Sequence, residues 1–205
     1  MLMRVVTLLT YARDVPADAP VLRTGGVPLA PDGFAWPTCA ECGGAMMFLA
    51  HLPVDAGVVS VFMCQNDPGL CEEWDPAVGG NRAYLFPADA ALHAVAPPAE
   101  GETALTVVTG LQPTPVAEDS YPAAMKAWTD SGNDRRDTLG QLAGDPHWLQ
   151  ADETPTCPDC EQRMKFAAML EQGRDYQTGM NFGGDGWGYT FTCAGCARAG
   201  FLWQC

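Results

Sequence analysis

Short apolar runs, separated by proline- and glycine-rich stretches, dominate the pattern along this chain. The runs have the length and the β-branched and aromatic content typical of strands. They predict strands at residues 3–10, 45–52, 58–63, 82–86, 103–111 and 188–192. A helix is predicted from Ser120, its N-cap, to about Thr129, with Pro122 in the first turn. The sequence therefore predicts a mainly β protein of the β-rich α+β class.

One stretch of the chain occurs twice. Residues 37–42 read PTCAEC, and 118 positions later residues 155–160 read PTCPDC. Further along, a shift of 129 pairs Phe62 with Phe191, so the second copy holds about eleven additional residues. We predict two pseudo-repeated halves, residues 1–112 and 113–205, each with antiparallel strands. The proline-containing run 112–119 is the predicted junction.

The cysteines follow the same division. They form two groups of four, Cys39, Cys42, Cys64, Cys71 and Cys157, Cys160, Cys193, Cys196, and leave Cys205 over. Two residues between paired cysteines let a tight turn direct both sulfurs at one point, and a second pair completes a tetrahedron. We predict one closed four-thiolate zinc site in each half, hence two structural zinc ions. In the first half a longer loop must deliver Cys71.

Three other uses of these cysteines are open at this point. They are disulfides, thiol redox chemistry and an iron–sulfur cluster. Zinc is favoured because the short apolar run Val5–Leu9 is too brief for a secretory leader or a membrane span, which predicts a reducing, cytoplasmic location. His51 is a further candidate ligand, although a strand histidine beside four cysteines more often bonds a backbone carbonyl.

Charge narrows the range of partners. The formal net charge is −14, and it becomes −18 if eight thiolates add −8 and two zinc ions add +4. Such a field repels phosphate backbones, so nucleic acid is excluded as a partner. It attracts a basic protein. The alternative is that the negative charge serves only to keep the protein soluble.

Polar and glycine-rich positions supply the candidates for catalysis and ligand binding. Asp145, His147, Asp185 and Tyr189 are the groups that an active site between the halves would use. The glycine-rich loop 182–188 resembles a nucleotide loop, but it precedes a strand where a dinucleotide fingerprint opens a helix. Its aromatic residues suit protein contacts or the covering of the core.

The ordered motifs resemble those of a known family. They are Gly25-Gly26-x-Pro28, Cys39-x2-Cys42, Phe62-x-Cys64, Gly144-x-Pro146-x-Trp148, Cys157-x2-Cys160 and Trp187-Gly188-Tyr189-x-Phe191-x-Cys193-x2-Cys196. In this order they resemble the programmed cell death protein 2 family and the related YwqG-like bacterial family of uncharacterised proteins. The eukaryotic members are thought to bind a basic ribosomal protein, which implies an acidic, zinc-containing adaptor. Those members also carry a MYND-type finger with no counterpart here, so their partner is not transferred.

Three functions follow as hypotheses. The leading one is a non-enzymatic, structural-zinc protein that acts as a protein-binding adaptor or chaperone-like factor, with a basic protein as the candidate partner. The second is an enzyme with its active site between the halves. The third is a zinc and thiol redox sensor in which the terminal Cys205 starts the exchange.

Overall fold

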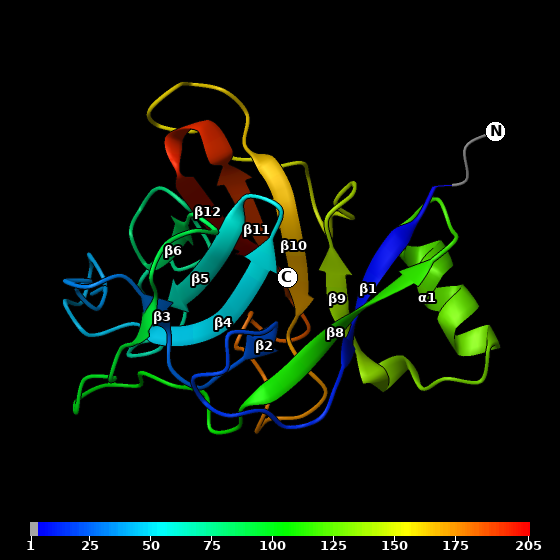
Figure 1. The fold of residues 1–205 in the computed structure, drawn as a ribbon, viewed down its shortest axis with the longest axis horizontal. Coiled ribbons are helices and arrows are strands. Elements are labelled where there is room, and N and C mark those ends of the chain that lie inside the picture. Colours follow the sequence, from blue (N-terminus) through cyan, green and yellow to red (C-terminus); the bar gives the residue numbers. More distant parts are fainter. Residues whose placement is uncertain (1–3) are drawn as a thin grey trace.

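A closed barrel of ten antiparallel strands forms the body of the protein in the computed structural model, which describes residues 4–205 (Figure 1). Around the barrel the order is β1-β8-β2-β4-β5-β6-β12-β11-β10-β9, and β9 pairs with β1 to close it. The bounds are β1 Val6–Tyr11, β2 Arg23–Thr24, β4 Met47–Val54, β5 Gly57–Met63, β6 Asn81–Phe86, β8 Thr109–Val116, β9 Thr138–Leu142, β10 Lys165–Glu171, β11 Trp187–Cys193 and β12 Arg198–Gln204. The predicted mainly β class is confirmed.

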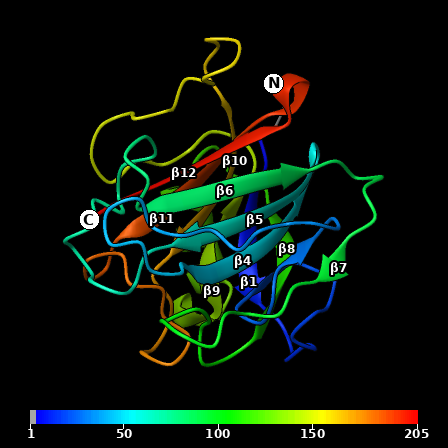
Figure 2. The ribbon, with the colours of Figure 1, turned by 90° about the vertical axis from the view of Figure 1, so that its left-hand side faces the viewer.

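The remaining elements lie outside the barrel. Two short strands, β3 (Leu29–Ala30) and β7 (His93–Ala94), form their own sheet beside it (Figure 2). Helix α1 (Tyr121–Asp130) packs against β1 and β8, and two 3-10 turns, η1 (Arg135–Asp137) and η2 (Ala194–Cys196), precede β9 and β12. The Ser120 hydroxyl accepts a hydrogen bond from the backbone N–H of Ala123, as the predicted N-cap requires.

Most predicted strands are present. Those at 45–52, 58–63, 82–86 and 188–192 correspond to β4, β5, β6 and β11 within two residues at each end. The strand predicted at 3–10 corresponds to β1, and its first residue, Met3, lies outside the described residues.

The strand predicted at 103–111 is wrong in its position. The observed strand β8 spans Thr109–Val116 and includes Pro113 and Pro115, which pair with Leu9 and Thr7 of β1. Residues two apart in a strand turn their nitrogens to the same edge. The N–H of Leu111 donates to the carbonyl of Leu22, so the nitrogens of Pro113 and Pro115 face the β2 edge, where no ladder partner is present beyond Leu111 among residues 4–205. The prolines therefore leave no ladder bond unmade, and the strand continues through them.

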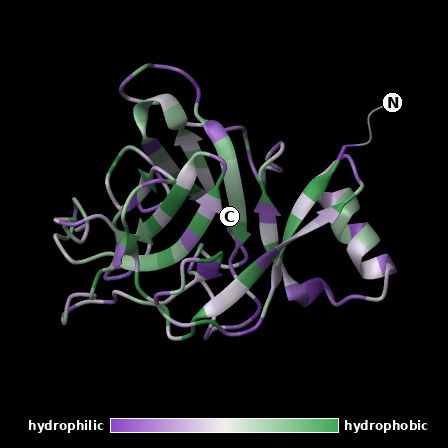
Figure 3. Cartoon of the chain, in the orientation of Figure 1, coloured by the Kyte–Doolittle hydropathy of each residue, from purple (hydrophilic) through white to green (hydrophobic). Residues whose placement is uncertain are grey.

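Apolar side chains fill the barrel. Figure 3 shows green, apolar colouring concentrated on the strands and purple on many connecting segments. The interior cluster draws on strands of both halves and on two loops: Leu9, Leu49, Ala50, Leu52, Val59, Val61, Met63, Leu85, Leu105, Leu111, Leu139, Ala168, Leu170, Met180, Phe182, Phe201 and Trp203. Smaller clusters lie on the outer faces of the β4–β5 and β10–β11 hairpins, and both include cysteines. Each cysteine group is thus anchored on a barrel hairpin.

The two halves share strand pairings. β1 pairs with β9 as well as with β8, and β6 pairs with β12 through Tyr84 and Arg198. Figure 2 shows β6 and β12 next to each other. The predicted boundary between residues 112 and 113 lies inside β8. The division into residues 1–112 and 113–205 stays a prediction, and the barrel is built from strands on both sides of it.

A buried arginine holds the approach to the first cysteine turn. Arg23 on β2 is fully buried, and its guanidinium donates hydrogen bonds to the backbone carbonyls of Ala19, Gly25 and Val27. The residue 118 positions later is Gln141, whose amide donates to the carbonyls of Ala143 and Asp145. These two acceptors are the counterparts of Gly25 and Val27, so the two loops are tied down in the same way.

We expect Arg23→Met to lower the free energy of unfolding by about 3 kcal/mol, because three carbonyls lose their donor and one of the three bonds is fully buried. Arg23→Gln should cost about half as much, since Gln141 makes two such bonds from the equivalent position. Urea unfolding of the three proteins measures both values. Surface substitutions usually change the free energy of unfolding by less than about 0.5 kcal/mol. A loss for Arg23→Met below that value would contradict this role.

A buried histidine lies beside this arginine. His51 on β4 pairs across the sheet with Arg23 on one side and Ser60 on the other. It is 1% exposed, and its Nδ1 has no hydrogen-bond partner among residues 4–205. Burial, followed by the nearby Arg23 charge, lowers the pKa of His51 to about 4.

The unfolded chain binds a proton at His51 near pH 6.5, whereas the folded protein does so only near pH 4. Stability should therefore fall as the pH drops from about 6.5 towards 4, by about 2 kcal/mol at pH 5. The His51→Met variant introduces the residue type of the counterpart position, Met169. It should not show the fall in stability that protonation of His51 causes at low pH. Urea unfolding at pH 7.5 and pH 5 tests it, and equal losses in both proteins would refute the assignment.

Candidate metal centres

Four cysteine sulfurs converge at one end of the β4–β5 hairpin. Cys39 and Cys42 come from the turn before β4, Cys64 follows β5 directly, and Cys71 comes from the next loop. Their Sγ atoms all lie within 4.8 Å of one another. Cys42 is exposed and the other three are buried. The longer loop predicted for Cys71 does deliver its sulfur to this group.

A second group of four sulfurs lies at the matching end of the β10–β11 hairpin. Cys157 and Cys160 come from the turn before β10, Cys193 is the last residue of β11, and Cys196 is the last residue of the η2 turn before β12. These Sγ atoms also lie within 4.8 Å of one another. The structure therefore brings together all eight predicted metal ligands in the predicted two groups. Each group can hold one metal ion.

The sulfur separations suit a metal ion better than a disulfide. The Sγ atoms of Cys42 and Cys64 are 3.6 Å apart, and those of Cys160 and Cys193 are 3.7 Å apart. Tetrahedral bonds of about 2.3 Å, the zinc–thiolate length, separate sulfur atoms by about 3.8 Å. A disulfide requires about 2.05 Å. All nine cysteines are free thiols here.

The two cysteine turns use the same backbone geometry. Gly43 N donates to Cys39 O over 3.0 Å, and Glu161 N donates to Cys157 O over 2.9 Å. Both residues lie in the left-handed region, with φ of 72° for Gly43 and 58° for Glu161. Glycine adopts this conformation without cost, whereas Glu161 is strained by roughly 1 kcal/mol. The second turn thus keeps the geometry of the first although its sequence is less suited to it.

Backbone hydrogen bonds and burial shift the pKa values of the first cysteine group in opposite directions. A hydrogen bond from the Gly44 N–H lowers the pKa of Cys42, because it stabilises the thiolate. Burial raises the pKa of Cys71 well above the normal range, and the neighbouring cysteines raise it further. One thiolate therefore forms readily, but four together need a cation to offset their repulsion.

The second group shows the same contrast. The backbone N–H of Asp159 lowers the pKa of the Cys157 thiol to about 7. The pKa of Cys196 rises to about 12, chiefly through its side-chain hydrogen bond with Cys160. A divalent ion bound to the sulfurs would offset the free-energy cost of holding several thiolates together, because it replaces the thiol protons.

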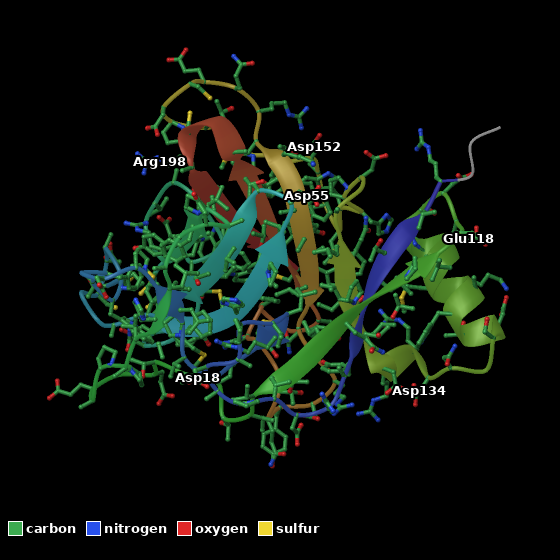
Figure 4. The ribbon with its side chains drawn as sticks, viewed as in Figure 1. Asp18, Asp55, Glu118, Asp134, Asp152 and Arg198 are labelled. Carbon is green, nitrogen blue, oxygen red and sulfur yellow. The ribbon has the colours of Figure 1, made fainter. Side chains whose placement is uncertain are left out.

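Polar side chains support both groups, and the sequence motifs did not identify them. Asn66 Nδ2 lies 3.5 Å from the Cys64 sulfur and 3.8 Å from the Cys42 sulfur, and it also donates to a backbone carbonyl. In the second half, Arg198 forms a bidentate pair with Asp159 of the cysteine turn, at 2.6 and 3.1 Å. Figure 4 places Arg198 beside the η2 turn. The only signal for them in the sequence is that each lies two residues after a cysteine, Cys64 or Cys196.

The four groups proposed for catalysis do not gather in either described cavity. Tyr189 is buried, and its hydroxyl donates to the His147 carbonyl and accepts from the backbone of Leu149. Asp145 is exposed beside Arg4, and Asp185 lies on an exposed turn. None of the four lines the cavities beside the β4–β5 turn or the 172–181 loop. His51 lies outside both cysteine groups.

Comparison with known proteins assigns no function. No protein-family model matches the chain. The chain is 35% identical over 71 residues to the uncharacterised protein YpfL of Salmonella typhimurium. The match covers 33% of this chain and 15% of YpfL, so the chain spans a small part of that relative. Within residues 4–205, no helix has the length and apolar content needed to cross a membrane.

Asn66 offers a test of the first centre that leaves its sulfur atoms in place. We expect Asn66→Ala to weaken metal binding there by about tenfold or more, because the thiolates lose their N–H donor. Competition with a chromophoric chelator measures it. Asn133→Ala, which removes an amide beside α1, is the control and should bind like wild type. Equal affinities in both variants would mean that Asn66 does not support the site.

Proposed function

We propose that the protein is a non-enzymatic binding module, stabilised by two structural zinc ions, that presents a surface to a partner protein. The observation that carries the proposal is the convergence of two groups of four thiols. A four-thiolate zinc site is closed, with no position for a water or substrate, so it serves the fold. Catalysis would need other groups, and the four candidates share neither described cavity.

The proposal includes an internal repeat. Strands β2, β4 and β6 have counterparts 118 positions later in β9, β10 and β12, and β5 has one in β11 at a shift of 129. Around the barrel, β2-β4-β5-β6 is followed by β12-β11-β10-β9, which is the same order reversed. The matching cysteine turns and the matching bonds of Arg23 and Gln141 support the same pairing.

The partner proposed is a protein with a basic surface. The chain has 25 acidic and 11 basic residues, and bound thiolates add further negative charge. Such a field speeds encounter with a positively charged protein. The resemblance to the programmed cell death protein 2 family points in the same direction and stays a prediction.

A thiol sensor is the second candidate function. Cys42 and Cys160 are the exposed members of their groups, so an oxidant can reach one sulfur of each centre. Oxidation of either thiolate would release its ion. Cys205 is also exposed, and replacing it with serine should leave the peroxide sensitivity unchanged if the centres themselves are the sensors.

Metal analysis tests the zinc sites. We expect two zinc ions per chain by mass spectrometry, one in Cys157→Ser and two in Cys205→Ser. Chelation should lower the melting temperature, because the bonds from the metal to four thiolates in each group are lost and the remaining thiolates repel one another. Metal-free protein with an unchanged melting transition, or a thiol titration that finds the group cysteines oxidised, would overturn the zinc assignment.

Affinity purification tests the binding role. The zinc-loaded, tagged protein should capture one partner in stoichiometric amount, and 0.5 M salt should weaken capture if charge guides it. Chelator-treated protein is the control. No stoichiometric partner under several growth conditions would overturn the binding role, whatever the metal content.

A further inference from the structure

A cavity of about 470 Å³ lies beside the turn that joins β4 to β5. Its wall is formed by that turn and by the neighbouring ends of β9, β10 and β11: Pro53, Val54, Asp55, Ala56, Leu142, Ala143, Lys165, Phe166, Ala167, Thr192 and Ala194. Apolar side chains predominate. Asp55 and Lys165 form an exposed ion pair of 3.5 Å, and Figure 4 places Asp55 at the β4–β5 turn.

The matching place in the first half contains a segment of the chain itself. Thr24, Gly25, Met47, Phe48 and Leu49 are the counterparts of the wall residues on β9 and β10. There the backbone N–H of Phe48 donates to the carbonyl of Thr103 over 3.0 Å, and Phe48 forms a parallel bridge with Ala104.

The same segment, residues 103–107, also contributes to the barrel interior. Two residues after Thr103, the Leu105 side chain joins the interior cluster and is 9% exposed. The segment then passes Gly25, where the carbonyl oxygen of Val107 occupies the space that a Cβ would need. The first half therefore shows how an extended peptide fits this position.

No such segment is present at the second-half position among residues 4–205. Phe166, the counterpart of Phe48, pairs with Phe191 of β11. On its other edge, β10 pairs with β9 from Ala168, opposite Leu142, and the N–H of Ala143 bonds the carbonyl of Ala167 over 2.8 Å. Within residues 4–205 the backbone of β10 is therefore unpaired on this edge at Phe166, next to an apolar space, which is the arrangement that accepts an added strand.

We infer that this cavity binds a short extended segment of a partner protein, which pairs in parallel with β10 at Phe166. An apolar side chain of that segment occupies the place that Leu105 has in the first half, against Val54, Ala56 and Leu142. This inference rests on the proposed binding role and names the part of the partner that is recognised.

Two features of the wall restrict the segment. Ala143 replaces Gly25, and its side chain stands where the Val107 carbonyl passes in the first half, so the segment must turn away after the buried apolar residue. The Asp55–Lys165 pair neutralises the rim locally, so we expect small, uncharged neighbours on either side of that residue.

The probe is a fluorescein-labelled peptide with the sequence of residues 101–107, the natural occupant of the first-half position. Fluorescence anisotropy should show saturable binding to the zinc-loaded protein. A peptide with Leu105→Asp should bind at least about tenfold more weakly, because the charge enters an apolar space. Equal binding of the two peptides would overturn the inference.

Ala56→Trp, which fills the cavity, should abolish peptide binding. Ala123→Trp on α1 is the matched control, since Ala123 is similarly half-buried and lies outside the cavity wall. Amide exchange on the wild-type protein needs no variant: the peptide should slow exchange at Phe166. Protection at Phe48 instead would mean that the peptide displaces the resident segment, and would refute the second-half site.

The same variants separate this inference from the binding role. Capture of the stoichiometric partner by wild type and Ala123→Trp, with loss in Ala56→Trp, supports both. Equal capture by all three proteins overturns the peptide site and leaves the binding role intact. Absence of any captured partner overturns the binding role, while saturable binding of the peptide at Phe166 would still uphold the site.

Discussion

Repulsion among thiolates gathered at one point is the constraint to which the rest of the structure responds. In each half, four sulfurs lie within 4.8 Å of one another at the end of a two-stranded hairpin. Backbone N–H groups stabilise the first charge, at Cys42 and Cys157, but burial and neighbouring sulfurs oppose the later ones. A divalent ion bound to each group would remove this conflict, because it would offset the charge of the thiolates that the hairpins bring together.

The barrel holds the two hairpins in place. β4–β5 and β10–β11 each carry a bulge near the phenylalanine that packs against the cysteine group, between Phe48 and Ala50 and between Phe166 and Ala168. A bulge bends the strand and increases its twist. The start of each strand thus directs one face to the cysteines, while the later part directs apolar residues to the barrel interior.

Differences between the matching positions are as informative as the likenesses. Arg23 and Gln141 make equivalent bonds with different side chains, and Gly43 and Glu161 adopt the same turn at different cost. At the outer edges of β4 and β10 the likeness ends. Thr103 and Ala104 pair with Phe48 there, whereas Phe166 pairs with β11 on one edge and with no segment of residues 4–205 on the other. The unmatched edge is where we propose that a partner segment binds.

The sequence alone determined the cysteine grouping, most strands and the helix, because these depend on local spacing, strand composition and capping. It misplaced β8, since Pro113 and Pro115 disrupt a strand only where an edge must be paired, and pairing is a tertiary property. Only the three-dimensional structure decided that strands from both predicted halves close one barrel, that Asn66 and Arg198 support the sulfur groups, and that a cavity lies at Phe166. These features join residues far apart in the chain, and no local pattern records which of them meet.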